Sequence, residues 1–521
     1  MKAVRMWVVL ILFLLVSGGL VFAGGGGQQQ GKAPAAATGD KELVVGVGVE
    51  PVYVTNLGDQ SSGDNDHVIM YNIFDTLFYR DAQGTIKPWL AESWSFSPDG
   101  KLLTVKLRND VYFHDGSKLK AEDVKFTYDY LKDKPLGKSL LINYDYTEVI
   151  DDNNLVIHLT DAFKPILSSF ASRIAIVLSK SYYDKVGKEG YDKAPIGTGA
   201  YKWVEWKSGD SIVMERNDNW WGGKAPFKKV TIKIIPDDNT RMLAVESGDI
   251  DVALALPLEN LQRTNNSKVT WNVVESNAMN FFQFNMEASR YPTQDLNFRK
   301  AVQYGIDKDA INQIVFAGKA TIIDTYGSPM FTGRPQPGTY DTYTHDVAKA
   351  KDYLSKSQYK GQDIIVYAQA GTPNARIAEV IQGSLKEVGI NIKVVAVDSA
   401  TFFDVIRNTG AFDAEVVINT SSIMDMDTLS NYFFTDRYDF KDMAHPHGQR
   451  MDEIIRLGRK EPDDNKRVEL YREFTNILNA DVNHVYILMD INTIAFRNDR
   501  VKDVKPSAFK YYRFSEWSPA N

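Results

Sequence analysis

The spacing of apolar residues along the chain alternates between that of buried strands and that of amphipathic helices. The clearest unit has a strand at residues 363–368, a helix beginning at Pro373 and a second strand at residues 390–397. The apolar face of this helix consists of Ile377, Val380, Ile381, Leu385 and Val388. Gly389 predicts the end of the helix, because glycine readily adopts the left-handed conformation. This order of elements predicts a right-handed βαβ crossover in a mostly parallel sheet.

A second βαβ unit is predicted earlier in the chain. It comprises a strand at residues 231–235, a helix beginning near residues 237–238 and ending at Gly248, and a strand at residues 251–254. A buried strand at residues 43–47 is expected to open the folded part of the chain. Two separate βαβ units predict an α/β fold of two lobes.

A pair of helices is predicted between the two units. One apolar face is formed by Phe298, Ala301, Val302 and Ile306, and the next by Ile311, Ile314 and Val315. Asp307 is placed to cap the second helix, and Gly318 to end it. The strand-like segment 281–286 comes just before this pair, and we predict that it forms the hinge between the lobes.

The N-terminus has the pattern of a secretory signal. Lys2 and Arg5 precede an unbroken apolar stretch at residues 7–16, and small residues lead to Ala23. We therefore predict a signal peptide at residues 1–23, while its use as an uncleaved anchor stays open. Residues 24–40 are rich in Gly, Gln and Ala and are predicted to be a flexible leader.

Composition and charge exclude several classes of protein. The 60 basic residues face 67 acidic ones, so the net charge of −7 offers no general attraction to nucleic acid. Removing Lys2 and Arg5 with the signal would leave 58 basic residues and a charge of −9. The chain has no cysteine, which excludes disulfides, thiolate metal sites and a lipid-anchored lipoprotein.

No pattern in the sequence predicts catalysis, a cofactor or a metal site. The seven histidines lack the HExxH spacing of zinc hydrolases, and neither a Walker loop nor a GxSxG elbow is present. We therefore expect a protein that is not an enzyme and has no cofactor. A secreted glycoside hydrolase stays open as a remote alternative, because acidic residues are abundant.

Several motifs occur in a characteristic order. They lie at residues 89–94 (WLAESW), 99–100, 107–116 (LRNDVYFHDG), 121–124 (AEDV), 195–201 (PIGTGAY), 216–222 (RNDNWWG), 246–251 (ESGDID) and 297–301 (NFRKA). This order resembles that of the family 5 extracellular solute-binding proteins, which are oligopeptide, dipeptide, nickel and oligosaccharide receptors of ABC importers. Ala200 stands where the family usually has proline. The resemblance extends over nearly everything from Glu42 onward.

The resemblance implies a receptor with two α/β lobes that close on a ligand about a hinge, and an extra subdomain in the first lobe. Lobe I would contain residues 41–280 and a C-terminal return at residues 490–521, and lobe II would contain residues 281–489. Such a receptor would be a periplasmic or otherwise extracytoplasmic monomer that delivers a small-molecule ligand to the transmembrane subunits of an ABC permease. The resemblance gives no support to nickel or haem as the ligand.

The ligand is predicted from the segment after residue 407. In peptide-binding relatives the strand that follows a GxFD turn ends in a tryptophan and an aspartate, and the aspartate pairs with the peptide ammonium. Asn419 and Ser422 stand at those two positions here, and Arg407 matches an arginine that touches peptide in some relatives. Because a buried ammonium without a carboxylate costs several kcal/mol, Asp425 or Asp427 would have to replace the aspartate in a peptide receptor.

Oligopeptides are the expected ligand, and oligosaccharides are the alternative. Neutral Asn419 and Ser422 among aromatic residues suit the hydroxyl groups and flat faces of a sugar. The predicted ligand-binding residues are Glu50, Tyr53, Asn285, Arg407, Asn419, Ser422, Asp425 and Asp427. A simpler interpretation stays open for some of them: Arg407 as a surface cation, and the two aspartates as caps of a helix beginning near Thr428.

Overall fold

The computed structural model describes residues 41–52, 54–55, 66–81, 84–286, 291–421, 423–429, 433–434 and 447–520. The predicted signal peptide at residues 1–23 and the leader at residues 24–40 lie outside these ranges. Within them, no helix combines the length and the apolar character needed to cross a membrane.

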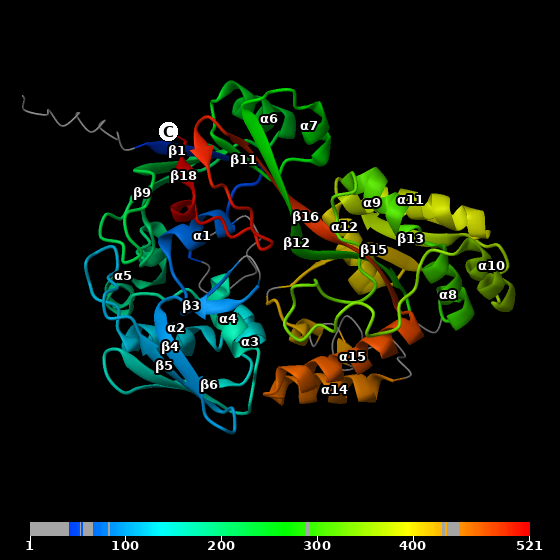
Figure 1. Cartoon of the computed structure of the whole chain (residues 1–521), viewed down its shortest axis with the longest axis horizontal. Coiled ribbons are helices and arrows are strands. Elements are labelled where there is room, and N and C mark those ends of the chain that lie inside the picture. The colour runs from blue at the N-terminus through cyan, green and yellow to red at the C-terminus, as the bar shows by residue number, and fades with distance from the viewer. Residues whose placement is uncertain are drawn as a thin grey trace, which may run out of the picture. The chain divides into compact units, whose positions relative to one another are not determined.

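A ten-stranded sheet connects the two halves of the fold (Figure 1). Its strand order is β14-β13-β15-β12-β16-β11-β1-β10-β9-β8. The strands are β1 (Glu42–Val47), β8 (Tyr201–Lys207), β9 (Ser211–Arg216), β10 (Lys229–Ile234), β11 (Val252–Leu254), β12 (Val269–Phe284), β13 (Ile364–Gln369), β14 (Ile392–Val397), β15 (Ala414–Thr420) and β16 (His484–Arg497). The predicted α/β fold class is therefore confirmed.

The long strands β12 and β16 form the link between the two halves of this sheet. They run antiparallel and side by side in Figure 1. Their paired residues extend from Val269 opposite Arg497 at one end to Gln283 opposite His484 at the other. The register shifts between Glu275 and Met279. Beyond β16 lies β11, and beyond β12 lies β15, so each half of the sheet attaches to one strand of this ribbon.

Two groups of apolar clusters define two lobes. The clusters of lobe I contain residues 43–254 and 494–517, while those of lobe II contain residues 258–489. Phe509 is an exception, because this C-terminal residue packs into a lobe II cluster. The C-terminal segment therefore contacts the cores of both lobes. Two small clusters also cross these ranges: Ile423 packs with Leu140 and Ile174 of lobe I, and Val269 packs with Met242 and Val245.

Lobe I contains the earlier βαβ unit. β1 lies between β10 and β11 and is parallel to both. Helix α6 (Asp238–Ser247) joins β10 to β11, and the Asp237 side chain accepts a hydrogen bond from the backbone N–H of Thr240. Gly248 ends the helix with φ = 88°. This crossover confirms the prediction and its two terminal signals.

A separate four-stranded antiparallel sheet forms a subdomain within lobe I. Its order is β4-β5-β7-β6, and helix α2 packs against β6. The strands are β4 (Ala91–Phe96), β5 (Leu102–Leu107), β6 (Tyr144–Val149) and β7 (Asn154–Leu159). The remaining helices and strands between β1 and β8 in lobe I are α1 (His67–Ile73), β2 (Phe78–Arg80), β3 (Ile86–Pro88), α2 (Ala121–Leu131), α3 (Pro135–Leu140), α4 (Ile166–Phe170) and α5 (Lys180–Lys193).

Lobe II contains the later βαβ unit. Helix α11 (Pro373–Val388) joins the parallel strands β13 and β14, with Pro373 in its first turn and Gly389 at φ = 101° after its end. The unit confirms the prediction, although β14 begins at Ile392. The other helices of lobe II are α8 (Leu296–Gly305), α9 (Lys308–Phe316), α10 (Val347–Lys356), α12 (Ser399–Asp404), α14 (Gly448–Lys460) and α15 (Asp464–Asp481). Helix α7 (Leu258–Arg263) precedes β12, and the short strands β17 (Val501–Lys502) and β18 (Ser518–Pro519) lie in the C-terminal segment.

The predicted helix pair consists of α8 and α9. The Asp307 side chain accepts a hydrogen bond from Ala310 N, which confirms it as the cap of α9. The predicted stop at Gly318 was one residue late, because α9 ends at Phe316 and Ala317 already adopts the left-handed conformation at φ = 49°. Gly318 N donates to Asn312 O, so the glycine completes the helix terminus.

The two glycines of the PIGTGAY segment are required by close packing on α1. A Cβ added to Gly197 would lie 2.0 Å from the carbonyl oxygen of Ile73, and one added to Gly199 would lie 2.5 Å from that of Asn72. Backbone atoms of a buried helix cannot move aside, so this motif belongs to the framework.

We expect Gly197→Ala to lower the free energy of unfolding by about 1–3 kcal/mol, because its methyl group would overlap the α1 backbone. Gly383→Ala in α11 is the matched control, since nothing lies within 4 Å of an added Cβ there. It should stabilise the protein by up to about 1 kcal/mol through helix propensity. Urea unfolding of both variants checks this; equal stabilities would contradict the packing argument.

Candidate ligand-binding site

Four aromatic side chains from opposite ends of the chain form what we call the aromatic wall: His67, Tyr71, Phe509 and Tyr511. The ring centroids of Tyr71 and Tyr511 lie 4.2 Å apart, and those of Phe509 and Tyr511 lie 4.9 Å apart. The His67 ring lies 5.6 Å from that of Tyr511. His67, Tyr71 and Phe509 are buried, and Tyr511 is partly exposed.

Helix α1 holds the C-terminal segment in place. The side-chain amide of Asn72 donates to Tyr512 O at 2.7 Å, and its oxygen accepts from Phe514 N at 2.9 Å. His67 Nδ1 hydrogen-bonds to Phe509 O at 2.8 Å. These bonds fix which rings of the segment face α1.

A cavity of about 190 Å³ is lined by Val68, Lys510 and Tyr512, which are sequence neighbours of the wall residues, and by none of the four wall residues themselves. Its lining includes Val47 and Gly48 after β1, Pro236 after β10 and Ala255 after β11, together with Tyr512. Ligands of open α/β sheets bind beyond the carboxyl ends of the strands. The backbone segment that carries Phe509 and Tyr511 therefore passes the edge of the sheet where a ligand is expected.

Two buried arginines extend the aromatic wall. The guanidinium of Arg513 lies 5.2 Å from the Tyr71 ring and 3.8 Å from the carboxylate of Asp75. Asp75 also accepts hydrogen bonds from Trp89 Nε1 at 2.6 Å and from Thr198 Oγ1 at 2.9 Å. The second arginine, Arg80 at the end of β2, lies 5.9 Å from the Phe509 ring.

The tyrosines of this region stay neutral at physiological pH. Burial raises the pKa of Tyr71 well above its ordinary value and raises that of Tyr79 to about 12. A neutral phenol offers a ligand both a flat apolar face and a hydroxyl group.

The end of β15 brings lobe II toward the wall. Asn277 of β12 donates from its side chain to Ser421 O at 2.6 Å, and its backbone N–H donates to Ala508 O at 3.0 Å. One residue of the linking ribbon therefore contacts both the C-terminal segment and the lobe II loop. Asn419, a predicted site residue, is buried on β15 opposite Met279, and its Oδ1 lacks a hydrogen-bond partner among the described residues.

Asp425 and Asp427 form buried ion pairs. Arg467 binds both carboxylate oxygens of Asp425, with Nη1 2.9 Å from Oδ2. Arg459 Nε donates to Asp427 Oδ1 at 2.7 Å. Asp425 also accepts from Asp427 N at 2.8 Å at the start of a 3₁₀ helix, Met426–Leu429. A ligand ammonium would have to compete with an arginine for either carboxylate.

Glu50 and Asn285 bind neighbouring parts of the framework. Glu50 Oε1 accepts from Gly209 N at 3.0 Å and from Trp206 Nε1 at 2.8 Å, and these bonds lower its pKa. Asn285 Nδ2 donates to Phe412 O at 2.9 Å. Both side chains join loops to neighbouring elements of their own lobe.

The other three predicted residues are not fully described. Tyr53 and Ser422 lie outside the described residues, and for Arg407 the structure describes only the backbone, in a short π-helix at Val405–Thr409. Their role in binding stays a prediction. The described residues contain no group of three or more His, Asp or Glu side chains arranged to hold a metal ion.

The sequence interpretation missed the aromatic wall and both arginines. The segment 508–513, Ala-Phe-Lys-Tyr-Tyr-Arg, concentrates three aromatic and two basic residues within the C-terminal return to lobe I, for which no binding residue was predicted. This concentration of aromatic and basic residues was the feature of the sequence that could have indicated a binding site.

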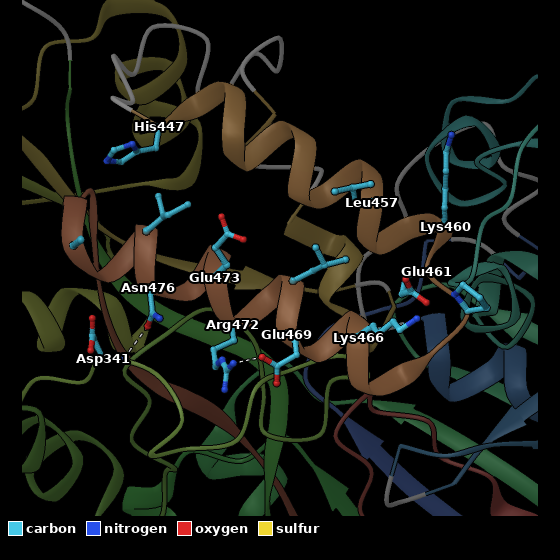
Figure 2. A pocket seen from close by; sticks show the side chains of 14 residues that line it. Asp341, His447, Leu457, Lys460, Glu461, Lys466, Glu469, Arg472, Glu473 and Asn476 are labelled. Carbon is cyan, nitrogen blue, oxygen red and sulfur yellow. Dashed lines mark hydrogen bonds and ion pairs between the residues drawn. The ribbon is translucent and has the colours of Figure 1, made fainter.

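A larger groove lies elsewhere, between α14 and α15 (Figure 2), and has a volume of about 1000 Å³. Its lining combines the apolar residues Leu457 and Leu470 with charged residues of both signs, among them Lys466, Glu469 and Arg472. It shares no residue with the aromatic wall, and its charges favour no ligand class.

Asp425→Asn should lower the free energy of unfolding by about 3–5 kcal/mol, because it leaves Arg467 buried without a counter-charge. Asp352→Asn removes an exposed partner of Lys356 on α10 and should change stability by less than about 1 kcal/mol. Denaturant unfolding of both variants measures the difference. Equal, small effects would show that the buried pair contributes no more than an exposed one.

Comparison with known proteins identifies the family. The family model of the bacterial extracellular solute-binding proteins, family 5, matches residues 85–441. The glutathione-binding protein GsiB of Pectobacterium atrosepticum is 28% identical over 368 residues, which cover 69% of this chain and 70% of that protein. The dipeptide-binding protein of Escherichia coli is 28% identical over 424 residues, which cover 74% of this chain and 77% of that protein.

The fold agrees with this match. The crystal structure of the ABC transporter substrate-binding protein CtaP from Listeria monocytogenes superposes with a TM-score of 0.83 at 23% identity, covering 92% of this chain and all of that one. The expected two-lobe binding-protein fold is thereby confirmed. The chain belongs to the family 5 bacterial extracellular solute-binding proteins and is a substrate-binding receptor of the ABC importer type.

Proposed function

We propose that this receptor captures oligopeptides between its lobes and delivers them to an ABC permease. The observation that carries the proposal is the aromatic wall with its two arginines, next to the lobe II loop that Ser421 begins. Flat rings pack against peptides of many sequences, and arginine pairs with carboxylates. The dipeptide-binding relative supports the same ligand class.

Oligosaccharides are the second candidate. The carboxylates of Asp425 and Asp427 are already bound by arginines, so neither is free for a peptide ammonium. Asn419 adds an unpaired buried acceptor that suits a hydroxyl group. Aromatic faces serve sugar rings as well as peptides.

We also propose that the lobes divide at residues 280 and 489, with lobe I at residues 41–280 and 490–521 and lobe II at residues 281–489. Most residues of the apolar clusters support this division, although Leu258 and Met279 pack in lobe II clusters. The chain would be exported by its signal at residues 1–23 and would act as a monomer outside the cytoplasm.

Contacts away from the aromatic wall support closure of the lobes about a hinge. Lys164 of lobe I donates from its backbone to Arg459 O at 2.8 Å, and its ammonium lies 3.3 Å from Asp464. Lys460 pairs with Asp161 across the same boundary. We call these the closing contacts. Because they join two lobes, they would stabilise only the closed state.

The ligand class is tested by a thermal-shift screen of the mature protein against di- to pentapeptides and neutral oligosaccharides. Ligands that bind the folded state raise the melting temperature. We expect peptide hits. A response to sugars alone would replace the peptide proposal, and conversion of any hit to products would indicate a hydrolase.

Removal of the closing contacts should weaken ligand binding. In the double variant Lys164→Ala, Lys460→Ala we expect the Kd of the best ligand from the screen to rise about two- to tenfold, because the closed state loses exposed ion pairs. Lys180→Ala, Lys356→Ala removes two exposed pairs within single helices and is the control. Calorimetric titration compares the two; equal Kd values would argue against the closing contacts.

A further inference from the structure

The guanidinium of Arg80 is a buried positive charge with little compensation. The residue is 5% exposed. Nη1 donates to Gly84 O at 2.6 Å, whereas Nη2 has no hydrogen-bond partner among the residues that the structure describes. No carboxylate of the described residues forms an ion pair with it. The guanidinium lies 5.9 Å from the Phe509 ring, and Tyr511 and Tyr71 also act on it electrostatically.

The carboxylates nearest in the fold are already occupied. Asp81 lies 3.6 Å from the ammonium of Lys87 and accepts a hydrogen bond from Thr85 N. Asp425 acts on Arg80 electrostatically but is bound at both oxygens by Arg467. Arg80, Asp425 and Arg467 together therefore carry one net positive charge in a buried setting.

Arg80 stands where the lobes meet. It ends β2, and Gly84 lies in the turn to β3. A Cβ added to Gly84 would lie 3.2 Å from Met330 O and 3.7 Å from Met424 Cε, both in lobe II. The Arg80 guanidinium thus lies between the aromatic wall of lobe I and the lobe II loop that contains Met424.

An uncompensated buried charge is costly, and here burial lowers the pKa of Arg80. A folded protein tolerates such a charge at a binding site, because a bound anion supplies the missing partner. Guanidinium groups bind carboxylates with directed, charge-assisted hydrogen bonds. The free Nη2 of Arg80 is the donor available for one.

We infer that Arg80 binds a carboxylate group of the ligand. The inference rests on the proposed receptor function and deepens it, because it selects ligands that carry a negative charge at one defined position. In a peptide that charge would come from the C-terminal carboxylate or from an acidic side chain. In a saccharide it would come from a uronic acid.

Calorimetric titration with matched probes tests the inference. The peptide probes are tetraalanine, its C-terminal amide, and that amide with glutamate at the last position; the sugar probes are trigalacturonate and maltotriose. In the wild type the charged member of a pair should bind about tenfold to a hundredfold more tightly. Arg80→Gln should abolish that preference, and Arg80→Lys should keep part of it. Arg376→Gln, an exposed arginine on α11, should keep all of it.

The melting temperature of the unliganded protein separates binding from structure. Because the charge lacks a partner, Arg80→Met should leave that temperature unchanged or raise it. A marked decrease would assign Arg80 to the framework and would overturn the inference.

The outcomes distinguish the inference from the proposed function. If tetraalanine, its amide and the glutamate-containing amide all bind equally well, the inference fails and the peptide receptor stands. If only trigalacturonate binds and binding depends on Arg80, the inference stands and the peptide proposal fails. If the glutamate-containing amide binds and tetraalanine does not, Arg80 binds an acidic side chain of the ligand and not its C-terminal carboxylate. A wild type that binds none of the probes overturns both.

Discussion

The pairing of β12 with β16 is the constraint on which the rest of the structure depends. These strands belong to both halves of one sheet, so the chain enters lobe II along one and returns along the other. The return carries the C-terminal segment back to α1, where Asn72 fixes Tyr512 and Phe514. The aromatic wall exists only because this ribbon forms. Asn277, on the ribbon itself, also contacts the lobe II loop at Ser421.

Charge balance distinguishes framework from candidate site. Asp425 with Arg467 and Asp427 with Arg459 are compensated pairs, and such pairs hold the loop after β15 against α14 and α15. Arg80 differs because its Nη2 lacks a partner. In a low-dielectric interior, a polar group without a partner costs more free energy than several charges that are paired with one another. On the inference drawn above, Arg80 would select a ligand with a negative group even though the whole chain is acidic.

The most recognisable motifs serve the framework. Gly197 and Gly199 let the backbone approach α1, and Thr198 binds Asp75, which also holds Trp89 and faces Arg513. These contacts position the wall without facing a ligand. Such motifs can therefore be shared by relatives named for glutathione and for dipeptides, while the ligand is decided elsewhere.

The sequence by itself determined the two βαβ units with their helix ends at Gly248 and Gly389, the cap of α9 at Asp307, and the family. Those features depend on neighbours a few residues away, so local spacing predicts them. Only the tertiary structure decided the partners of Asp425 and the aromatic wall. Arg467 lies 42 residues after Asp425, and Phe509 lies 442 residues after His67. Contacts at such separations are set by how the strands pair and the lobes pack, and no local pattern encodes them.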